Sequence, residues 1–352
     1  MKTIRFILVF AIFISGFYSC STDVDLYADY KEVPIIYGML NSRADTNFIK
    51  ITHAFCGTND DPINANEVAL IYDSSNYSGK LDVRIVELSN LNGGAYEPTG
   101  RDFAFDTITI HKKKNGTFYA PDQLVYYTTE PFNAGNENSH YKYRLKVVKP
   151  DGDTLTALTG MVGSEEFQIV TGSLAFDDRE SNAMNRIMFR ADGMAGLYEV
   201  AIRFDYHEQL AGQDVRYKSI SRSFGMRTID EFQKVEGTKN TYYLECSVNW
   251  LFNALATAIG GDTIVNPNHP NVVRYYDRMQ ISITAAGEDL YYYYIANQAQ
   301  QNCLSGYVSV YSNIDGGYGL FSSRTQIEKV CRLSNWTLRS LYGKTSWGFK
   351  EQ

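Results

Sequence analysis

The side chains that most often do chemistry in proteins are few in this chain and lie far apart. Its five histidines, His53, His111, His140, His207 and His269, form no HExxH motif and no i, i+4 pair on a predicted helix. The sequence also contains no GxSxG nucleophile elbow and no Walker loop. Local motifs therefore give no support to metalloprotease, serine hydrolase or nucleotide-hydrolysing chemistry.

Three pairs of adjacent acidic residues are the remaining local candidates: Asp60-Asp61, Glu165-Glu166 and Asp177-Asp178. Paired carboxylates can bind calcium or act in glycoside hydrolysis. Each pair lies in a loop-like context without the oxygen ligands and glycine of an EF-hand, which favours solvated turns. We expect no enzymatic activity, no metal and no cofactor, although motifs do not reveal a site assembled from distant segments.

The cysteines suggest structure and anchoring more than catalysis. Apart from Cys20, the chain has Cys56, Cys246, Cys303 and Cys331, at wide spacing and without a CxxC motif, which argues against a zinc site. In an oxidising compartment these four could form two bridges. We favour free buried thiols, with a disulfide between Cys303 and Cys331 as the alternative.

Residues 1–19 have the order of a lipoprotein signal peptide. Lys2 and Arg5 precede an apolar run that is too short to span a bilayer comfortably. Cys20 follows this run and resembles the lipobox cysteine of bacterial lipoproteins, so we predict that it is lipidated. The alternative is an ordinary secreted protein that loses Cys20 with its signal.

Residues 20–32 form the predicted lipidated tether. Several acyl chains on Cys20 would give a stable attachment to the outer membrane, because one chain alone binds only marginally. The acidic residues Asp23 and Asp25 resemble the tag that sends some lipoproteins of the phylum Bacteroidota to the cell surface. A simple solvated tether on the periplasmic face is the alternative.

Composition indicates an ordered, strand-rich protein. Aromatic residues make up 14% of the 352 residues and charged residues 21%, which argues against disorder. The length is comfortable for two domains. The formal net charge of −7, without a basic stripe, argues against nucleic acid as a partner.

Residues 33–163 are predicted to form an N-terminal β-sandwich of immunoglobulin-like type. Short alternating segments such as VPIIYGML and LDVRIVEL are separated by turn signals, including Asn115-Gly116. The segment YKYRLKVVKPDGDTLTALTGMV is predicted to form a hairpin about its Pro-Asp-Gly-Asp turn. No long helix interrupts this pattern.

Residues 164–352 are predicted to form a second β-sandwich that carries two α-helices. NRIMFRADGMAGLYEVAIRFDYHEQ is predicted to be a hairpin, and NWLFNALATAIGG is a helix with start and stop signals. GEDLYYYYIANQAQQN is predicted to be a second helix, whose face of Tyr291, Tyr294, Ile295 and Gln298 packs against the sheet in preference to forming a carbohydrate platform.

A glycine-rich motif near the C-terminus is the segment of this sequence that most resembles a ligand-binding loop. It contains Asn313, Ile314, Gly316, Gly317, Gly319 and Phe321 within YSNIDGGYGLFSS. A dinucleotide loop would place a helix after the glycines, but here the following residues alternate as a strand does. We predict a turn or bulge within a strand pair, at the rim of a sheet.

These six residues give the chain a resemblance to a known family. They are similar to the Asn-Ile-x-Gly-Gly-x-Gly-x-Phe ending of a Bacteroidota outer-membrane lipoprotein family that is catalogued as a domain of unknown function. The resemblance implies an envelope lipoprotein often associated with TonB-dependent transporters. It implies no catalytic residues.

The resulting hypothesis is a non-enzymatic binding or accessory module at the outer membrane, linked to TonB-dependent nutrient uptake. The alternative is a structural subunit of a fimbria or adhesin, assembled by strand exchange between copies. In that case the C-terminal segment LRSLYGKTSWGFKEQ would be the exchanged strand, although its Trp347 and Phe349 more simply close the sheet.

Overall fold

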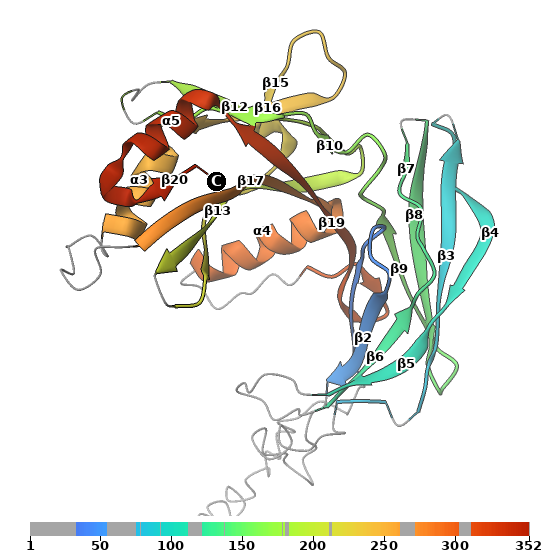
Figure 1. Ribbon diagram of the computed structural model, residues 1–352. Coiled ribbons are helices and arrows are strands. Elements are labelled where there is room, and N and C mark those ends of the chain that lie inside the picture. The colour runs from blue at the N-terminus through green and yellow to red at the C-terminus, as the bar shows by residue number, and fades with distance from the viewer. Residues whose placement is uncertain are drawn as a thin grey trace, which may run out of the picture.

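A computed structural model describes residues 33–54, 75–77, 79–91, 93–111, 122–136, 138–177, 179, 183–210, 213–260, 272–302 and 311–351. The predicted signal peptide and tether lie outside these residues, as does the predicted turn at Asn115-Gly116. Strands dominate the described chain and form several sheets (Figure 1). The predicted mainly-β class is therefore confirmed.

One half of the molecule, here called the first β unit, has two sheets around a common core. One sheet runs in the order β1 (Val33–Leu40), β2 (Asn47–Ala54), β6 (Gln123–Thr128) and β5 (Asp106–Ile110). The other contains β9 (Thr154–Gly160), β8 (Ser139–Val148), β3 (Asp82–Leu91) and β4 (Glu97–Ala104), with β7 (Gly135–Asn136) paired to β8.

The alternating pattern of the sequence explains this core. In β8, Tyr143, Leu145 and Val147 are all fully buried, while the residues between them face outward. They pack with Ile36 of β1 and Phe103 of β4 in one apolar cluster. The predicted hairpin between β8 and β9 is confirmed by their antiparallel pairing.

The other half, here called the second β unit, also has two sheets. The larger contains β14 (Arg216–Arg227), β13 (Ala195–Leu210), β17 (Val272–Gly287) and β19 (Tyr318–Leu333). The smaller contains β10 (Gln168–Ile169), β12 (Met184–Arg190), β16 (Thr241–Ser247) and β15 (Gln233–Lys234). Short strands β11 (Ser173–Leu174) and β20 (Phe349–Lys350) pair with β19 and β17.

The predicted hairpin over Asn185–Gln209 is wrong. β12 pairs with β10 and β16, whereas β13 pairs with β14 and β17, so the chain crosses from one sheet to the other at Asp192. Each strand buries its apolar residues in the shared core, Phe189 from β12 and Phe204 from β13. Alternation alone specifies a buried face and does not specify the partner strand.

Three α-helices lie among the described residues, one more than predicted. The two predicted helices are confirmed as α3 (Trp250–Gly260) and α4 (Glu288–Asn302). The third, α5 (Asn335–Gly343), begins before the segment considered as an exchanged strand and includes its first six residues, 338–343. Ser334 caps it by accepting a hydrogen bond from Thr337 N at 3.1 Å, and Leu341 is fully buried.

The packing expected of α4 is only partial. Ile295 remains 45% exposed and Gln298 is exposed, while Tyr291 and Tyr294 are half-buried. Tyr292, from the other side of the helix, is also 45% exposed. Helix α4 thus covers the sheet through half-buried contacts, and its tyrosines do not form a fully buried face.

Strand β19 belongs to both halves of the molecule. Its residues from Tyr318 to Ser323 pair in parallel with β1, and those from Arg324 to Cys331 pair with β17 in the opposite direction. The largest sheet therefore continues from one β unit into the other (Figure 1). The predicted domain ranges need this correction, because residues 314–323 lie in the first β unit and not in the second.

Candidate functional site

The six residues of the glycine-rich motif are placed as structural residues. The prediction of a turn within one strand pair is wrong, because the two flanking strands belong to different sheets. β18 (Ile314–Asp315) pairs with β9 in one sheet, and β19 then pairs with β1 in the other. Asn313 Nδ2 donates to Phe321 O at 2.7 Å, and Phe321 N donates to Asn313 Oδ1 at 2.9 Å. The motif therefore closes the first β unit.

Steric limits explain the glycines of this motif. Gly316 and Gly319 have positive φ angles of 83° and 123°. A Cβ on Gly317 would lie 2.9 Å from Pro34 O, and one on Gly319 would collide with Ile36 O. Phe321 is fully buried in the core of the first β unit, so this end of the motif has a packing role.

A buried polar network joins the two β units. Asp192 accepts backbone hydrogen bonds from Gly163 and Ser164 at Oδ2, at 2.9 and 2.8 Å, and from Met194 at Oδ1, at 2.8 Å. The Tyr198 hydroxyl accepts from Asp192 N and donates to Asp192 O. Burial raises the pKa of Tyr198, which keeps it neutral.

Two further contacts lie at the same junction. Ser323 Oγ of β19 donates to Gly160 O of β9 at 2.6 Å and accepts at 3.1 Å from the backbone N–H of Val162, whose side chain belongs to the core of the second β unit. Asp289, at the start of α4, accepts from Thr159 Oγ1 at 3.0 Å. Because the side chains of Asp192, Ser323 and Asp289 all make hydrogen bonds at this junction, the two units meet in a defined arrangement.

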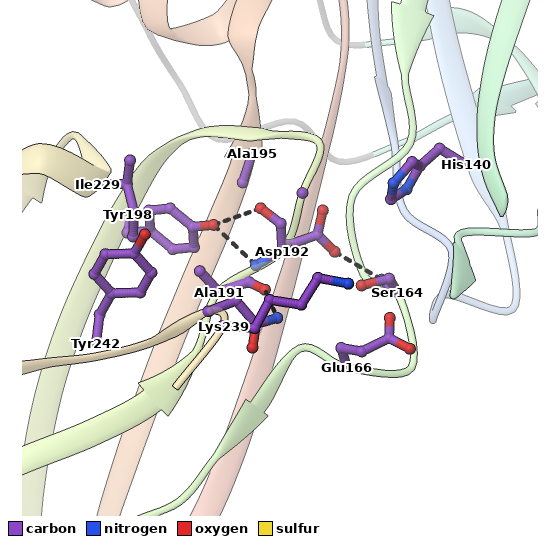
Figure 2. A pocket seen from close by; sticks show the side chains of 12 residues that line it. His140, Ser164, Glu166, Ala191, Asp192, Ala195, Tyr198, Ile229, Lys239 and Tyr242 are labelled. Atoms are coloured by element: carbon purple, nitrogen blue, oxygen red, sulfur yellow. Dashed lines mark hydrogen bonds between the residues drawn. The ribbon is translucent and has the colours of Figure 1, made fainter. Parts of the chain in front are cut away.

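A pocket of about 330 Å³ lies at this junction, and residues from both units line it (Figure 2). Its buried lining includes Ala191, Asp192, Tyr198 and Ser164. Around them lie the half-buried or exposed side chains of His140, Glu166, Ile229, Lys239, Asn240 and Tyr242. The pocket therefore combines aromatic and aliphatic side chains with a few polar groups, a lining that is typical of sites for small molecules.

His140 is the only described histidine that lines this pocket. Its Nδ1 atom is buried and meets no hydrogen-bond partner among the described residues. Other histidines have aromatic or acidic neighbours: His207 Nδ1 lies 2.7 Å from Asp277, and His111 Nδ1 lies 2.8 Å from Asp122. His269 lies outside the described residues.

Of the predicted acidic pairs, the structure describes Glu165, Glu166 and Asp177. Glu166 lines the junction pocket, but Asp177 interacts with Arg179 and with Trp336, whose Nε1 donates to it at 2.7 Å. Asp60, Asp61 and Asp178 lie outside the described residues. Within the part of the chain that the structure describes, no group of three His, Cys, Asp or Glu side chains is placed to hold a metal.

The described cysteines are buried free thiols. Cys246 and Cys331 are each 1% exposed, and burial raises the pKa of the Cys246 thiol to about 11. The alternative disulfide between Cys303 and Cys331 is not formed, since Cys331 is a free thiol that donates to Thr171 O. Cys20, Cys56 and Cys303 themselves lie outside the described residues.

Sequence reasoning did not identify most of the pocket. Asp192 lies within the segment predicted to be a hairpin, and no motif includes Lys239 or Tyr242. The available signal is the boundary predicted between residues 163 and 164, because the chain crosses there from one core to the next. Pockets are common at such crossings.

No helix among the described residues is long and apolar enough to cross a membrane. Comparison of the sequence with models of known protein families, and with curated proteins, finds no match.

Proposed function

We propose that this protein is a non-enzymatic lipoprotein of the bacterial outer membrane that acts as a binding or accessory module for TonB-dependent nutrient uptake. The observation that carries the proposal is the order of a basic flank, a short apolar run, a few small and aromatic residues and then Cys20. The resemblance of the motif from Asn313 to Phe321 to an envelope lipoprotein family adds the link to transporters. The proposed location is the cell surface or the periplasmic face.

The arrangement of the two β units supports a binding role. Each has two sheets that share an apolar core, which agrees with two β-sandwiches, the first of immunoglobulin-like type. Strand β19 pairs with strands of both units and so connects the two sides of the junction. A preformed pocket binds with a smaller entropic cost than one that must be ordered.

Two observations argue against the alternative of a fimbrial subunit assembled by strand exchange. The segment from Ile314 to Ser323 already occupies the edge of the first β unit, so a strand from another copy would have to displace it. At the C-terminus, Phe349 is buried against Phe204 and Tyr206 of its own chain. Both segments thus act as closing strands, whereas strand exchange needs a free one.

Protease shaving and affinity purification from intact cells test the proposal. The wild-type chain, tagged at its C-terminus, is expected to be digested from outside and to co-purify with a TonB-dependent transporter after gentle solubilisation. Cys20→Ala is the control, because it removes the lipidated thiol and leaves the folded part unchanged. Recovery of a protected, uncomplexed wild-type protein would contradict both the surface location and the partner.

A further inference from the structure

We propose that the outer face of the larger sheet of the second β unit binds a sugar ring that carries a carboxylate group, such as a uronic acid. The site is a cavity of about 430 Å³ on strands β14, β13 and β17, here called the sheet-face pocket. It shares no lining residue with the junction pocket. This inference goes beyond the proposed function, because it depends on neither a lipid anchor nor a transporter.

Strand pairing places the polar groups of this pocket on one face. Arg203 and Asp205 alternate along β13 with Phe204, which belongs to the core, so both point away from the core. Asp205 lies opposite Ser219 of β14 on one side and opposite Arg278 of β17 on the other. The register of three neighbouring strands therefore brings these side chains together.

A β-bulge adds a further charged group from β17. The register between β13 and β17 shifts after Asp205, and Asp277 is the residue left without an opposite partner. In a regular strand neighbouring side chains point to opposite faces, whereas Asp277 and Arg278 both line the sheet-face pocket. Bulges are common next to functional sites, where they redirect a side chain.

Arg203 and Arg278 are suited to bind an anion. Both guanidinium groups bind the same oxygen atom, because Arg203 Nη2 donates to Asp205 Oδ2 at 3.1 Å and Arg278 Nε donates to it at 2.7 Å. The two groups therefore lie next to each other, and one carboxylate leaves the pair with one positive charge in excess.

Several N–H donors of this arginine pair are free. Arg203 Nη1 and both terminal nitrogens of Arg278 meet no hydrogen-bond partner among the described residues. Guanidinium groups bind a carboxylate through two parallel hydrogen bonds. A ligand carboxylate, with one charge and two acceptor oxygens, therefore matches both the free donors and the excess charge.

Asp277 favours a ligand that also carries hydroxyl groups. Its Oδ1 accepts a hydrogen bond from His207 Nδ1 at 2.7 Å, and its Oδ2 has no partner in the part of the chain that the structure describes. A carboxylate at this place repels a simple anion. A sugar hydroxyl can donate to Asp277, and the exposed Ser219 hydroxyl lines the same pocket.

Tyr217 offers an apolar surface to the ring of the sugar. It lies opposite His207, whose ring centroid is 5.8 Å from its own, and His207 is stacked in turn on Tyr275. Tyr217 is nevertheless 80% exposed. Because one face of a sugar ring presents C–H groups, stacking on Tyr217 removes apolar surface of both from water.

Isothermal titration calorimetry of the full-length protein, in micelles of a detergent without a sugar headgroup, tests this inference. Methyl glucuronide is expected to bind saturably at one site. Methyl glucoside lacks the carboxylate and should bind at least about tenfold more weakly, as the loss of charge-assisted hydrogen bonds predicts. Acetate lacks the ring and should bind at least about fivefold more weakly.

Two variants connect the binding to the sheet-face pocket. Arg278→Gln should weaken methyl glucuronide binding by about tenfold or more, and Tyr217→Ala by about fivefold or more. Both residues are exposed, so the fold should persist, and far-UV circular dichroism checks this. Arg84→Gln is the matched control, because the Arg84 side chain is 49% exposed like that of Arg278 and is paired with an aspartate, but lies in the first β unit.

Three outcomes would overturn the inference: no binding of methyl glucuronide to the folded wild type, equal binding of methyl glucoside or acetate, or unchanged binding to Arg278→Gln. Affinity purification from cells separates this inference from the proposed function. If the wild type binds no glucuronide but still co-purifies with a transporter, only the ligand assignment fails. If the glucuronide binds and no transporter co-purifies, only the uptake link fails.

Discussion

Gly319 has the strongest steric requirement of any residue in the C-terminal motif. Its φ of 123° places it where other residues are strained, and an added Cβ would collide with Ile36 O of the paired strand. Gly319→Ala is therefore expected to destabilise the protein by about 3 kcal/mol or more, measured by urea unfolding.

Gly172→Ala is the matched control for that change. An added Cβ at Gly172 meets no atom within 4 Å, so its effect should stay within about 0.5 kcal/mol. Equal effects of the two substitutions would show that the close approach of β19 to β1 is not the cause.

The buried thiols make a second prediction at the scale of single residues. Burial raises the pKa of Cys246 to about 11, and it also raises the pKa of Cys331. Since the thiolate is the reactive form, iodoacetamide at pH 8 should leave both unmodified in the native protein and should label both in urea. Mass spectrometry of peptides gives the measurement, and rapid native labelling of Cys331 would argue against its burial.

At the scale of elements, the carboxylate of Asp177 is one of the contacts that attach α5 to the loop after β11, beside the hydrogen bonds between Thr337 and Phe176. Asp177 accepts from Arg179 and from Trp336, and these partners lower its pKa to about 2. A lowered pKa contributes stability above the unfolded value of about 4, and this contribution is lost as the pH falls towards 2. Unfolding midpoints at pH 5 and pH 2.5 should therefore differ more for the wild type than for Asp177→Asn. Equal differences would contradict the assignment, because other carboxylates contribute to both proteins alike.

The closing segment makes a prediction about the predicted N-terminal domain. Residues 33–163 lack β18 and the start of β19, which complete its two sheets. The isolated fragment should be unfolded, because the edges and core that β18, β19 and Phe321 cover would face water. Addition of a peptide of residues 311–325 should restore β-sheet circular dichroism. The same peptide with Gly319→Ala serves as the control, and folding of the fragment alone would contradict the prediction.

At the scale of the whole molecule, the shared strand should make the two β units unfold together. Phe103→Ala removes a fully buried ring from the first core, and Phe189→Ala does so in the second. Each should cost about 3 to 5 kcal/mol and shift one common transition in differential scanning calorimetry. Two separate transitions, each sensitive to one variant, would mean that the junction does not couple the units.

Much of the local structure was predictable, because alternation and start signals act over a few residues. Tyr143, Leu145 and Val147 were recognisable as one buried face, and Asn249 with Gly260 marked the ends of α3. Helix α5 was missed because its apolar residues are few, although Ser334 and Thr337 carried a capping signal.

Strand partners and the pocket depended on tertiary structure. The motif from Asn313 to Phe321 indicated a turn in the sequence, but the strand beside it, β1, begins 285 residues before Tyr318, at Val33. Likewise, His140, Glu166 and Lys239 become neighbours only when two cores pack at the crossing near Gly163. The periodicity of a segment specifies which face is buried, whereas contacts between distant segments depend on how whole sheets pack.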